Sequence, residues 1–410
     1  MRKDVWILNH YATEMGINKG GRHFWIAKYL KKNGYNPVIF CSSFPHKGEK
    51  NYIDDNKKFS VETFEDIPFV YIKTNEYQDN GKQRIKNMFQ YFWRLLRNYK
   101  KIANVIGKPD VIIGSSVHPL ACLAAIIIGK KYKIKKIVEI RDLWPENLVS
   151  MKYLKENSFF TKLLYCGEKY LYKKADEIIF LMEGGKRYIL DRGWQNDINL
   201  DKIHYINNGV DLEKFEDLSN KIIYDEDLLN SKFKIIYTGS VSTANNIKNI
   251  VDLAEKTVAD DDIIYLIYGD GNELGVLKEY AREKNIKNLK FKGYVNKEQI
   301  PAIICKADIL VINVSEKMIE ADRYGISYNK MFEYLASGKY ILQLQNIPNS
   351  ILGENECGYI IKNEDPKDII YMIKNLSKEE YEENSRKQKN IAKNYDFKDL
   401  TDKVIRILEK

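Results

Sequence analysis

The chain has 410 residues, a formal net charge of +9 and a hydrophobic fraction of 44%. A chain of this length is too long for a single hydrophobic core, and its apolar content is sufficient for two cores. We therefore exclude a disordered chain and predict two domains. The five cysteines are scattered and odd in number, and the five histidines show no paired ligand spacing. These patterns argue against a disulfide framework and against a protein-held metal, so we expect reduced thiols in a cytoplasmic protein.

The positive charge lies in the first half of the chain. Residues 1–200 hold 35 Lys and Arg against 21 Asp and Glu, whereas the remainder has a net charge of −5. This asymmetry predicts an anionic partner for the first half only, with ordinary solvated basic faces as the alternative.

The chain opens with Met1-Arg2-Lys3, followed at once by the apolar run from Val5 to Leu8. This apolar run is too short for the core of a signal peptide and indicates a buried first strand. The longest apolar run, from Leu120 to Gly129, has about half the length that a membrane span needs. We therefore expect a protein that is not integral to a membrane.

Short apolar runs rich in β-formers alternate with longer helical patterns, which is typical of parallel sheets in α/β domains. The first series of predicted strands covers residues 5–9, 37–41, 69–72, 110–114, 136–140 and 177–181. The second series covers residues 233–237, 263–268, 289–291, 308–312 and 340–344. The fold class predicted is thus α/β, with two doubly wound, Rossmann-like domains.

The turn-rich stretch 207–211 separates the two series and suits an interdomain linker. We place the first domain at residues 1–208 and the second at residues 209–393. Residues 394–410 form a last helix with an apolar stripe, which we expect to pack back on the first domain. The stripe consists of Leu400, Val404, Ile407 and Leu408.

In doubly wound sheets, ligands collect at the carboxyl ends of the strands. After the first strand, Gly20, Gly21 and Arg22 lead into a helix, where backbone amides could approach a phosphate, and we expect all three residues at a phosphate-binding site. The spacing is not that of a dinucleotide site, and a simple glycine turn explains it as well. After the fourth strand, His118 precedes Pro119 at a helix start and could contact a phosphate or a sugar hydroxyl.

A charged motif follows the fifth strand. Charged residues at the end of a buried strand are costly unless they pair or bind a ligand. Arg141 could hold a phosphate, and Asp142 or Glu146 an acceptor hydroxyl. The alternative is an internal arginine–carboxylate pair that shapes the loop.

In the second domain, Gly239 and Ser240 end the first strand, where backbone amides can face a diphosphate. Tyr294 and Val295 end another strand, where a planar base could stack. Lys330 and Glu333 are three residues apart in a predicted helix that ends at Gly338, so they share one helical face. A cation there suits a phosphate and a carboxylate suits a ribose diol, although a surface salt bridge would have the same spacing.

Four motifs together resemble glycosyltransferase family 4, and more narrowly the bacterial WbuB-like group of O-antigen and capsule assembly. They are Glu139 to Glu146, Asn208 to Asp211, Tyr268 to Gly271 and Lys330 to Gly338. The resemblance implies a GT-B fold, in which two Rossmann-like domains face each other across a cleft. It also implies a metal-free, retaining transfer from a nucleotide-diphosphate sugar held mainly by the second domain, with Glu333 on the ribose and the acceptor in the first domain.

The same resemblance suggests a UDP-sugar donor, with an N-acetylated hexosamine or a deoxyhexosamine as the sugar. The acceptor it implies is a lipid-linked or other saccharide in the synthesis of cell-surface polysaccharide.

The sequence departs from the wider family at two places. The family often has a glutamate eight positions before the ribose-binding one, where this chain has Gly325. It also has an Arg/Lys pair in the loop after Gly239, where the nearest cation here is Lys248. The diphosphate contacts are therefore expected from Arg323, Lys330 or Lys248.

Two other classes of function fit some of these features. A UDP-sugar 2-epimerase shares the architecture, but it needs acid/base carboxylates and histidines clustered in the cleft. A nucleic-acid-binding module is suggested only by charge, and no nucleic-acid motif supports it.

Residues 82–101 interleave lysines and arginines with aromatic and aliphatic side chains. A basic amphipathic helix of this kind suits anionic headgroups, so we expect peripheral binding to the cytoplasmic face of a membrane. The alternative is a helix docked on its own sheet with a basic outer face.

Overall fold

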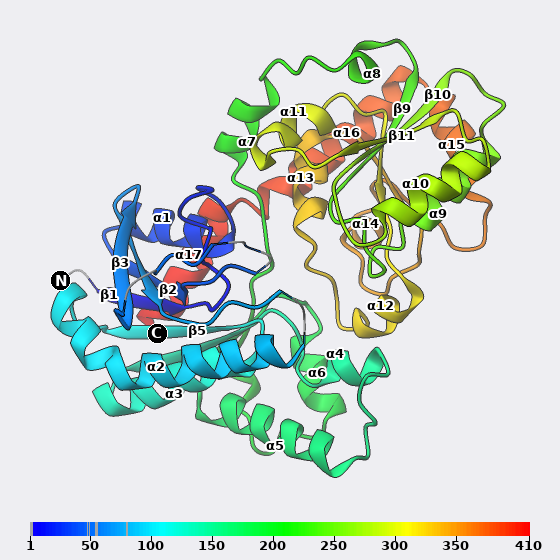
Figure 1. Cartoon of the computed structure of the whole chain (residues 1–410). Coiled ribbons are helices and arrows are strands. Elements are labelled where there is room, and N and C mark those ends of the chain that lie inside the picture. Colours follow the sequence, from blue (N-terminus) through cyan, green and yellow to red (C-terminus); the bar gives the residue numbers. More distant parts are fainter. Residues whose placement is uncertain (1–2, 47, 49, 54–55, 79–80) are drawn as a thin grey trace. The chain divides into compact units, whose positions relative to one another are not determined.

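The computed structural model describes residues 3–46, 48, 50–53, 56–78 and 81–410, and it divides into two compact units (Figure 1). Unit 1 consists of Met1–Asn207 and Phe397–Lys410, and unit 2 of Asn208–Asp396. The boundaries expected from sequence, at residues 208 and 393, lie close to these divisions. The second division comes later than expected because Asp396 still pairs with Val210 in an isolated parallel bridge of unit 2.

Unit 1 is built on an eight-stranded sheet with the order β3-β4-β2-β1-β5-β6-β7-β8. All pairings are parallel except that of β3 with β4. The strands are β1 (Asp4–Leu8), β2 (Asn36–Ser42), β3 (Phe59–Phe64), β4 (Ile67–Ile72), β5 (Val111–Ser116), β6 (Lys135–Ile140), β7 (Glu177–Phe180) and β8 (Ile203–Tyr205). The helices are α1 (Arg22–Lys32), α2 (Lys82–Ile106), α3 (Pro119–Tyr132), α4 (Glu146–Ser150), α5 (Phe159–Lys174), α6 (Gly185–Asp191) and α17 (Phe397–Glu409).

Helices cover both faces of this sheet, so its central strands are largely apolar, and the polar residues of β5 and β6 lie at or near the strand ends. In β1, Val5 and Ile7 join a core cluster with residues of α1 and α17. Trp6 and Leu8 point to the other face and join residues of α2 and α3. This alternation follows from the two-residue period of a strand, and it leaves polar groups to the strand ends.

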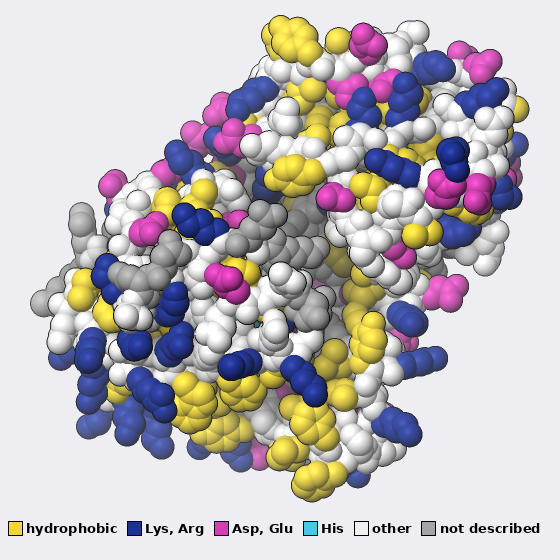
Figure 2. All heavy atoms as spheres, viewed as in Figure 1, with side chains coloured by type: hydrophobic (Ala, Val, Ile, Leu, Met, Phe, Trp, Pro, Cys, Tyr) yellow, Lys and Arg dark blue, Asp and Glu magenta, His cyan; other side chains and the backbone are white. Residues whose placement is uncertain are grey.

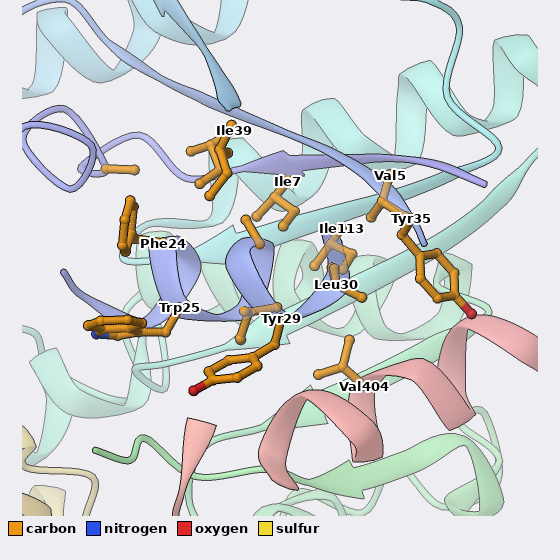
Figure 3. Packing of buried hydrophobic residues seen from close by; sticks show 14 of the residues in the cluster. Val5, Ile7, Phe24, Trp25, Tyr29, Leu30, Tyr35, Ile39, Ile113 and Val404 are labelled. Carbon is orange, nitrogen blue, oxygen red and sulfur yellow. The ribbon is translucent and has the colours of Figure 1, made fainter. Parts of the chain in front are cut away.

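The last helix, α17, completes the core of unit 1. Leu400, Val404, Ile407 and Leu408 are all buried in the cluster that contains Val5 and Leu30. Figure 3 shows Val404 of α17 facing Leu30 and Tyr29 of α1. The position of α17 in unit 1 agrees with the expectation that residues 394–410 pack back on the first domain, and its predicted apolar stripe makes the contact.

Unit 2 is built on a six-stranded parallel sheet with the order β11-β10-β9-β12-β13-β14. Its strands are β9 (Phe233–Thr238), β10 (Ile263–Tyr268), β11 (Leu289–Gly293), β12 (Ile309–Ile312), β13 (Tyr340–Gln343) and β14 (Tyr359–Ile360). Its helices are α7 (Leu212–Ser219), α8 (Glu226–Leu229), α9 (Lys248–Lys256), α10 (Leu274–Glu283), α11 (Ile300–Ile304), α12 (Glu316–Ala321), α13 (Asn329–Ser337), α14 (Ile351–Glu354), α15 (Pro366–Lys374) and α16 (Lys378–Lys393). Two core clusters again occupy the two faces of the sheet.

Sequence analysis missed β3, β8 and β14. The strand β3 lies at the sheet edge with β4 as its neighbour, and its residues are partly or fully exposed. An edge strand of this kind lacks the continuous apolar run by which the central strands are found. The other two strands have three and two residues.

No helix in the described part of the chain is both long enough and apolar enough to cross a membrane.

We predict that Leu400→Ala destabilises unit 1, because it removes a side chain that is only 1% exposed between α17 and α1. The expected cost is about 2–5 kcal/mol. All five tryptophans of the chain lie in unit 1, so their fluorescence during urea unfolding reports on this unit. Lys403→Ala, at an exposed position of the same helix, is the control. Equal unfolding midpoints for the two variants would contradict the role of α17.

Candidate functional site

The candidate site of unit 2 lies at the carboxyl ends of β9 and β10, where two glycines allow the strand ends to approach closely. The Gly239 amide donates to the Tyr268 carbonyl at 3.0 Å. Gly269 has a φ of +153°, and a Cβ there would lie 1.8 Å from the Gly239 carbonyl oxygen. Only glycine fits at position 269, and the close approach holds the ends of β9 and β10 together at the edge of the sheet where ligands collect in such folds.

Lys330, in the first turn of α13, reaches this pair of loops. Its Nζ donates to the Tyr237 hydroxyl at 2.8 Å and lies 4.2 Å from the centre of that ring. The Tyr237 hydroxyl in turn donates to the Ser240 carbonyl at 3.0 Å. No carboxylate pairs with Lys330 in the part of the chain that the structure describes, and burial lowers the pKa of its ammonium to about 7. A diphosphate bound here would supply the missing negative charge.

Tyr334 fixes α13 against the end of β9. Its hydroxyl accepts from the Thr238 amide at 2.9 Å and lies 3.1 Å from the Thr238 hydroxyl. The segment that precedes α13 is also held in place, because Asn208 Nδ2 donates to the Ser327 carbonyl at 2.9 Å. The helix that carries the cation is therefore anchored at both sides of Lys330.

Glu333 lies one turn after Lys330 and is partly exposed. Its carboxylate makes no hydrogen bond or ion pair with any residue that the structure describes, and burial raises its pKa. The surface salt bridge with Lys330, which the spacing also allowed, is not formed, because the ammonium turns toward Tyr237. A half-buried carboxylate without a partner is suited to accept hydrogen bonds from a ligand.

Two of the cations expected on the diphosphate are held elsewhere. The Lys248 ammonium lies 2.7 Å from both carboxylate oxygens of Asp252 and 4.5 Å from the centre of the Tyr280 ring. The Arg323 guanidinium pairs with Glu320, three residues away at the end of α12. Lys248 is therefore paired at a surface position within α9, and its role on a diphosphate stays a prediction. Lys330 is the cation that the structure brings to Gly239.

The other expected contacts of unit 2 are at strand ends. The Ser240 carbonyl accepts from Tyr237 and from Asn245 Nδ2, both at 3.0 Å, so the loop after β9 has one defined shape. Tyr294 follows β11 with 79% of its surface exposed, which leaves its ring open to stacking. Val295 packs against the core instead.

In unit 1, the dominant polar feature is the buried carboxylate of Glu139 at the end of β6. It accepts from Arg22 Nε, His23 Nε2 and Ser115 Oγ, each at 2.8 Å. Arg22 also donates to the carbonyls of Ile206 and Asn207, the last residues before the chain leaves unit 1. Arg22 is only 3% exposed, so the expectation that it binds a phosphate is wrong. The Arg22 guanidinium is paired with the Glu139 carboxylate instead.

The two glycines before Arg22 stand at the start of α1. Gly21 has a φ of +94° and immediately precedes the helix, and the Gly20 amide donates to the Met15 carbonyl at 3.1 Å. The turn therefore has the helix-start position expected from sequence, and the role of its amides toward a ligand stays a prediction.

His118 lies in a cluster of aromatic and imidazole rings at the ends of β1 and β5. Its ring is 4.8 Å from that of His10 and 5.9 Å from that of Tyr11. Both ring nitrogens are buried without a hydrogen-bond partner among the described residues, and burial lowers the pKa to about 3. The imidazole is therefore neutral at ordinary pH, which suits a sugar hydroxyl better than a phosphate.

The motif after β6 is divided between two environments. Arg141 and Asp142 are partly exposed, and the pKa of Asp142 is raised by burial and lowered by the charge of Arg141. Glu146 is buried, accepts the Tyr165 hydroxyl at 2.7 Å and lies 3.8 Å from Arg192. The expectation that Glu146 binds an acceptor is wrong, because this carboxylate has an internal partner, as the alternative interpretation allowed.

Sequence reasoning missed several residues that shape these sites. The buried partners Glu139 and His23 gave no signal beyond being charged residues in apolar surroundings. Tyr237 lies inside an apolar run, and Asn245 lies in a polar loop. Their contacts depend on side chains that are distant in the sequence, so no local pattern contains them.

Two family models divide the chain between them. Residues 25–214 match the model described as Glycosyltransferase Family 4, and residues 220–408 match Glycosyl transferases group 1. The chain is a GT-B glycosyltransferase similar to family 4. The comparisons do not favour the epimerase alternative, since the matching models are those of glycosyltransferases.

Individual relatives of this glycosyltransferase extend the picture. An uncharacterized glycosyltransferase of Methanocaldococcus jannaschii is 25% identical over 406 residues, which are 93% of this chain and 92% of that protein. A putative colanic acid biosynthesis glycosyl transferase of Escherichia coli, WcaI, is 18% identical over 126 residues, 30% of this chain and 31% of that protein. The structure of Anabaena HepE in complex with UDP and glucose covers all of both chains with a TM-score of 0.66 at 11% identity. The GT-B fold predicted from sequence is thereby confirmed.

We predict that diphosphate binding to the transferase depends on the protonation of Lys330. The free ammonium has a pKa of about 7, so above this value binding must be accompanied by proton uptake. The affinity for UDP should fall by up to about tenfold per pH unit between pH 7 and 9. Lys330→Arg, which stays charged throughout, should show a flatter profile in calorimetric titrations. Uridine, which lacks the diphosphate, is the control ligand, and parallel profiles for wild type and Lys330→Arg would contradict the contact.

Proposed function

We propose that this glycosyltransferase moves a sugar from a UDP-sugar to a saccharide acceptor, with retention at the anomeric carbon and without a metal ion. The observation that carries the proposal is the arrangement on α13. Lys330 faces the glycine loops without a carboxylate partner, and Glu333 presents an unpaired carboxylate one turn away. A nucleoside diphosphate has the complementary groups, with negative charge at one end and a ribose diol at the other.

In the proposed reaction, the bond between the anomeric carbon and the diphosphate oxygen breaks and UDP leaves. A hydroxyl of the acceptor forms the new bond on the same face of the sugar and releases its proton. Negative charge develops on the departing diphosphate, where Lys330 and the Ser240 amide stabilise it, since the Gly239 amide already donates to the Tyr268 carbonyl. Tyr294 is the candidate for stacking on the base, and Gly21 is the candidate backbone donor in unit 1, since the Gly20 amide already donates to the Met15 carbonyl.

The acceptor side of the proposal rests on unit 1. The neutral imidazole of His118 and the partly exposed side chains of Arg141 and Asp142 offer a hydroxyl acceptor, a cation and a carboxylate. We propose a lipid-linked saccharide as acceptor, in the synthesis of cell-surface polysaccharide, on the inner face of the cell membrane. The excess of cations in the first half of the chain is complementary to anionic lipids. The relative WcaI, described as a colanic acid enzyme, supports a role in polysaccharide synthesis.

The donor class is tested by incubating the protein with UDP-, GDP- and dTDP-sugars and measuring the release of nucleotide. UDP release from one N-acetylated hexosamine or deoxyhexosamine donor, undiminished by EDTA, is the expected result. Release from GDP- or dTDP-sugars only would contradict the choice of base, and conversion of the sugar to an epimer would contradict transfer.

We predict that Glu333→Gln weakens the binding of UDP roughly tenfold. A charge-assisted hydrogen bond contributes about 1.5–3 kcal/mol, against about 1 kcal/mol for a neutral one. The amide keeps the shape of the side chain, so the melting temperature should hardly change. Glu333→Ala should bind more weakly still.

Calorimetric titration of UDP into wild type and variant measures this effect. Glu320→Gln, a change at an exposed carboxylate of α12 that pairs with Arg323, is the matched control. Equal dissociation constants for wild type and Glu333→Gln would remove the ribose role of Glu333.

A further inference from the structure

The helix α5 exposes a set of large apolar side chains at its start. Phe159 is 85% exposed, Phe160 58% and Leu163 57%. The opposite side of the helix is docked normally, with Tyr165, Leu171 and Tyr172 buried in unit 1. The helix therefore packs on unit 1, and its exposed apolar residues are not explained by the lack of a packing partner. Contiguous exposed apolar groups of this size usually mark a contact surface.

The helix α2 exposes a second apolar stripe in the same unit. Ile85, Phe89 and Trp93 recur every four residues and are 53%, 49% and 53% exposed. The inner side of α2 packs on the sheet through Tyr91, Phe92 and Leu95, among others. The helix α2 therefore packs on its own sheet, as the alternative interpretation of its sequence predicts. Its outer face is apolar as well as basic.

The two stripes belong to one side of unit 1. Both α2 and α5 contact α3, and Figure 2 shows hydrophobic side chains together with Lys and Arg over the part of unit 1 where Figure 1 places α2 and α5. We define the α2–α5 face by the exposed residues Ile85, Phe89, Trp93, Phe159, Phe160 and Leu163.

Exposed lysines and arginines lie on α2, in the segment before α5 and on α5 itself, together with the apolar residues of this face. None of them makes an ion pair with a residue that the structure describes. They are Lys82, Lys86, Arg97, Lys100 and Lys101 on α2, and Lys152, Lys155 and Lys162 at α5. The exposed acid nearest in sequence to Phe159, Glu156, pairs with Arg192. A second copy of the same face would bring these cations against one another, which disfavours self-association. An apolar surface with exposed cations on the same elements is complementary to an anionic lipid bilayer.

We propose that the α2–α5 face docks on anionic lipid and that Phe159, Phe160 and Leu163 insert into the boundary between headgroups and acyl chains. The cations of α2 supply an attraction that salt screens, whereas the side chains of α5 supply one that persists in salt. This inference rests on the proposed function for its setting, since a lipid-linked acceptor requires the enzyme at a membrane. It adds a hydrophobic anchor on a helix that sequence analysis did not single out.

The test uses the whole chain and flotation with vesicles of phosphatidylcholine, with and without phosphatidylglycerol. Wild type should bind the anionic vesicles and keep part of this binding at high salt. The double variant Phe159→Ser/Phe160→Ser should partition about tenfold more weakly or worse, and its remaining binding should disappear at high salt. The matched control, Ile222→Ser/Tyr224→Ser, removes side chains that are 78% and 90% exposed in unit 2 and should bind like wild type.

A second measurement follows Trp93 directly. Quenching of tryptophan fluorescence by brominated lipid should occur in wild type and be lost in Trp93→Phe. The proposal is overturned if wild type does not bind anionic vesicles, or if the Phe159/Phe160 variant binds as well as wild type at high salt. It is also overturned if the variant only converts a dimer to a monomer in sedimentation, or loses affinity for RNA instead.

Nucleotide release and UDP affinity, measured without vesicles, keep this inference separate from the proposed function. Both should be unchanged in the Phe159/Phe160 variant. Failure of wild type to bind UDP would remove the proposed function and leave the docking result standing, whereas failure of docking alone would leave the donor site standing.

Discussion

The architecture depends on the covering of both faces of a parallel sheet. In each unit, helices cover both sides of the central strands, so those strands are largely apolar and their polar residues lie at or near the strand ends. Polar chemistry is confined to the loops after the strands. In unit 2 these loops meet at Gly239 and Gly269, and α13 brings Lys330 and Glu333 to the same edge. In unit 1 the same constraint gathers Glu139, His118 and Arg141 at strand ends.

Burial of charge distinguishes the two sites. Glu139 is fully partnered by Arg22, His23 and Ser115, and this satisfied network fixes the start of α1 and the chain's exit from unit 1. Buried ionic groups of this kind tolerate no loss of a partner, because the remaining charge would be stranded. Lys330 and Glu333 are the opposite case, since each is half-buried and makes no ion pair with a described residue, and the charge of Lys297 only partly offsets the effect of burial on the pKa of Glu333. Networks that are complete inside the protein build structure, and those that are incomplete are suited to a ligand.

Much of the fold was predictable because the central strands have continuous apolar runs and the helices have period-3.6 stripes. The stripe of Leu400 and Val404 predicts an amphipathic helix, whereas the assignment of α17 to the first domain depended on the resemblance to a fold class in which such a tail packs there. The sites were predictable by position and less so by role. Arg22 and Glu146 were assigned to ligands because a sequence does not reveal that Glu139 and Tyr165 face them. Lys248 was chosen as the nearest cation in the chain, whereas its neighbour in space is Asp252. Exposure was equally hidden, since Phe92 and Trp93 are adjacent in sequence and only the second faces outward.

The placement of α17 has a consequence for how the chain matures on the ribosome. Most of unit 1 precedes unit 2 in the chain, yet its core is closed by α17, which is synthesised after the whole of unit 2. Until then, the apolar surface of α1 and the sheet beneath it lacks its cover. Unit 2 is a continuous segment and can reach its native packing first, as an insertion within an unfinished neighbour. The nascent protein therefore exposes this apolar surface of unit 1 until α17 has been synthesised. Such exposed surface is what holding chaperones protect from aggregation.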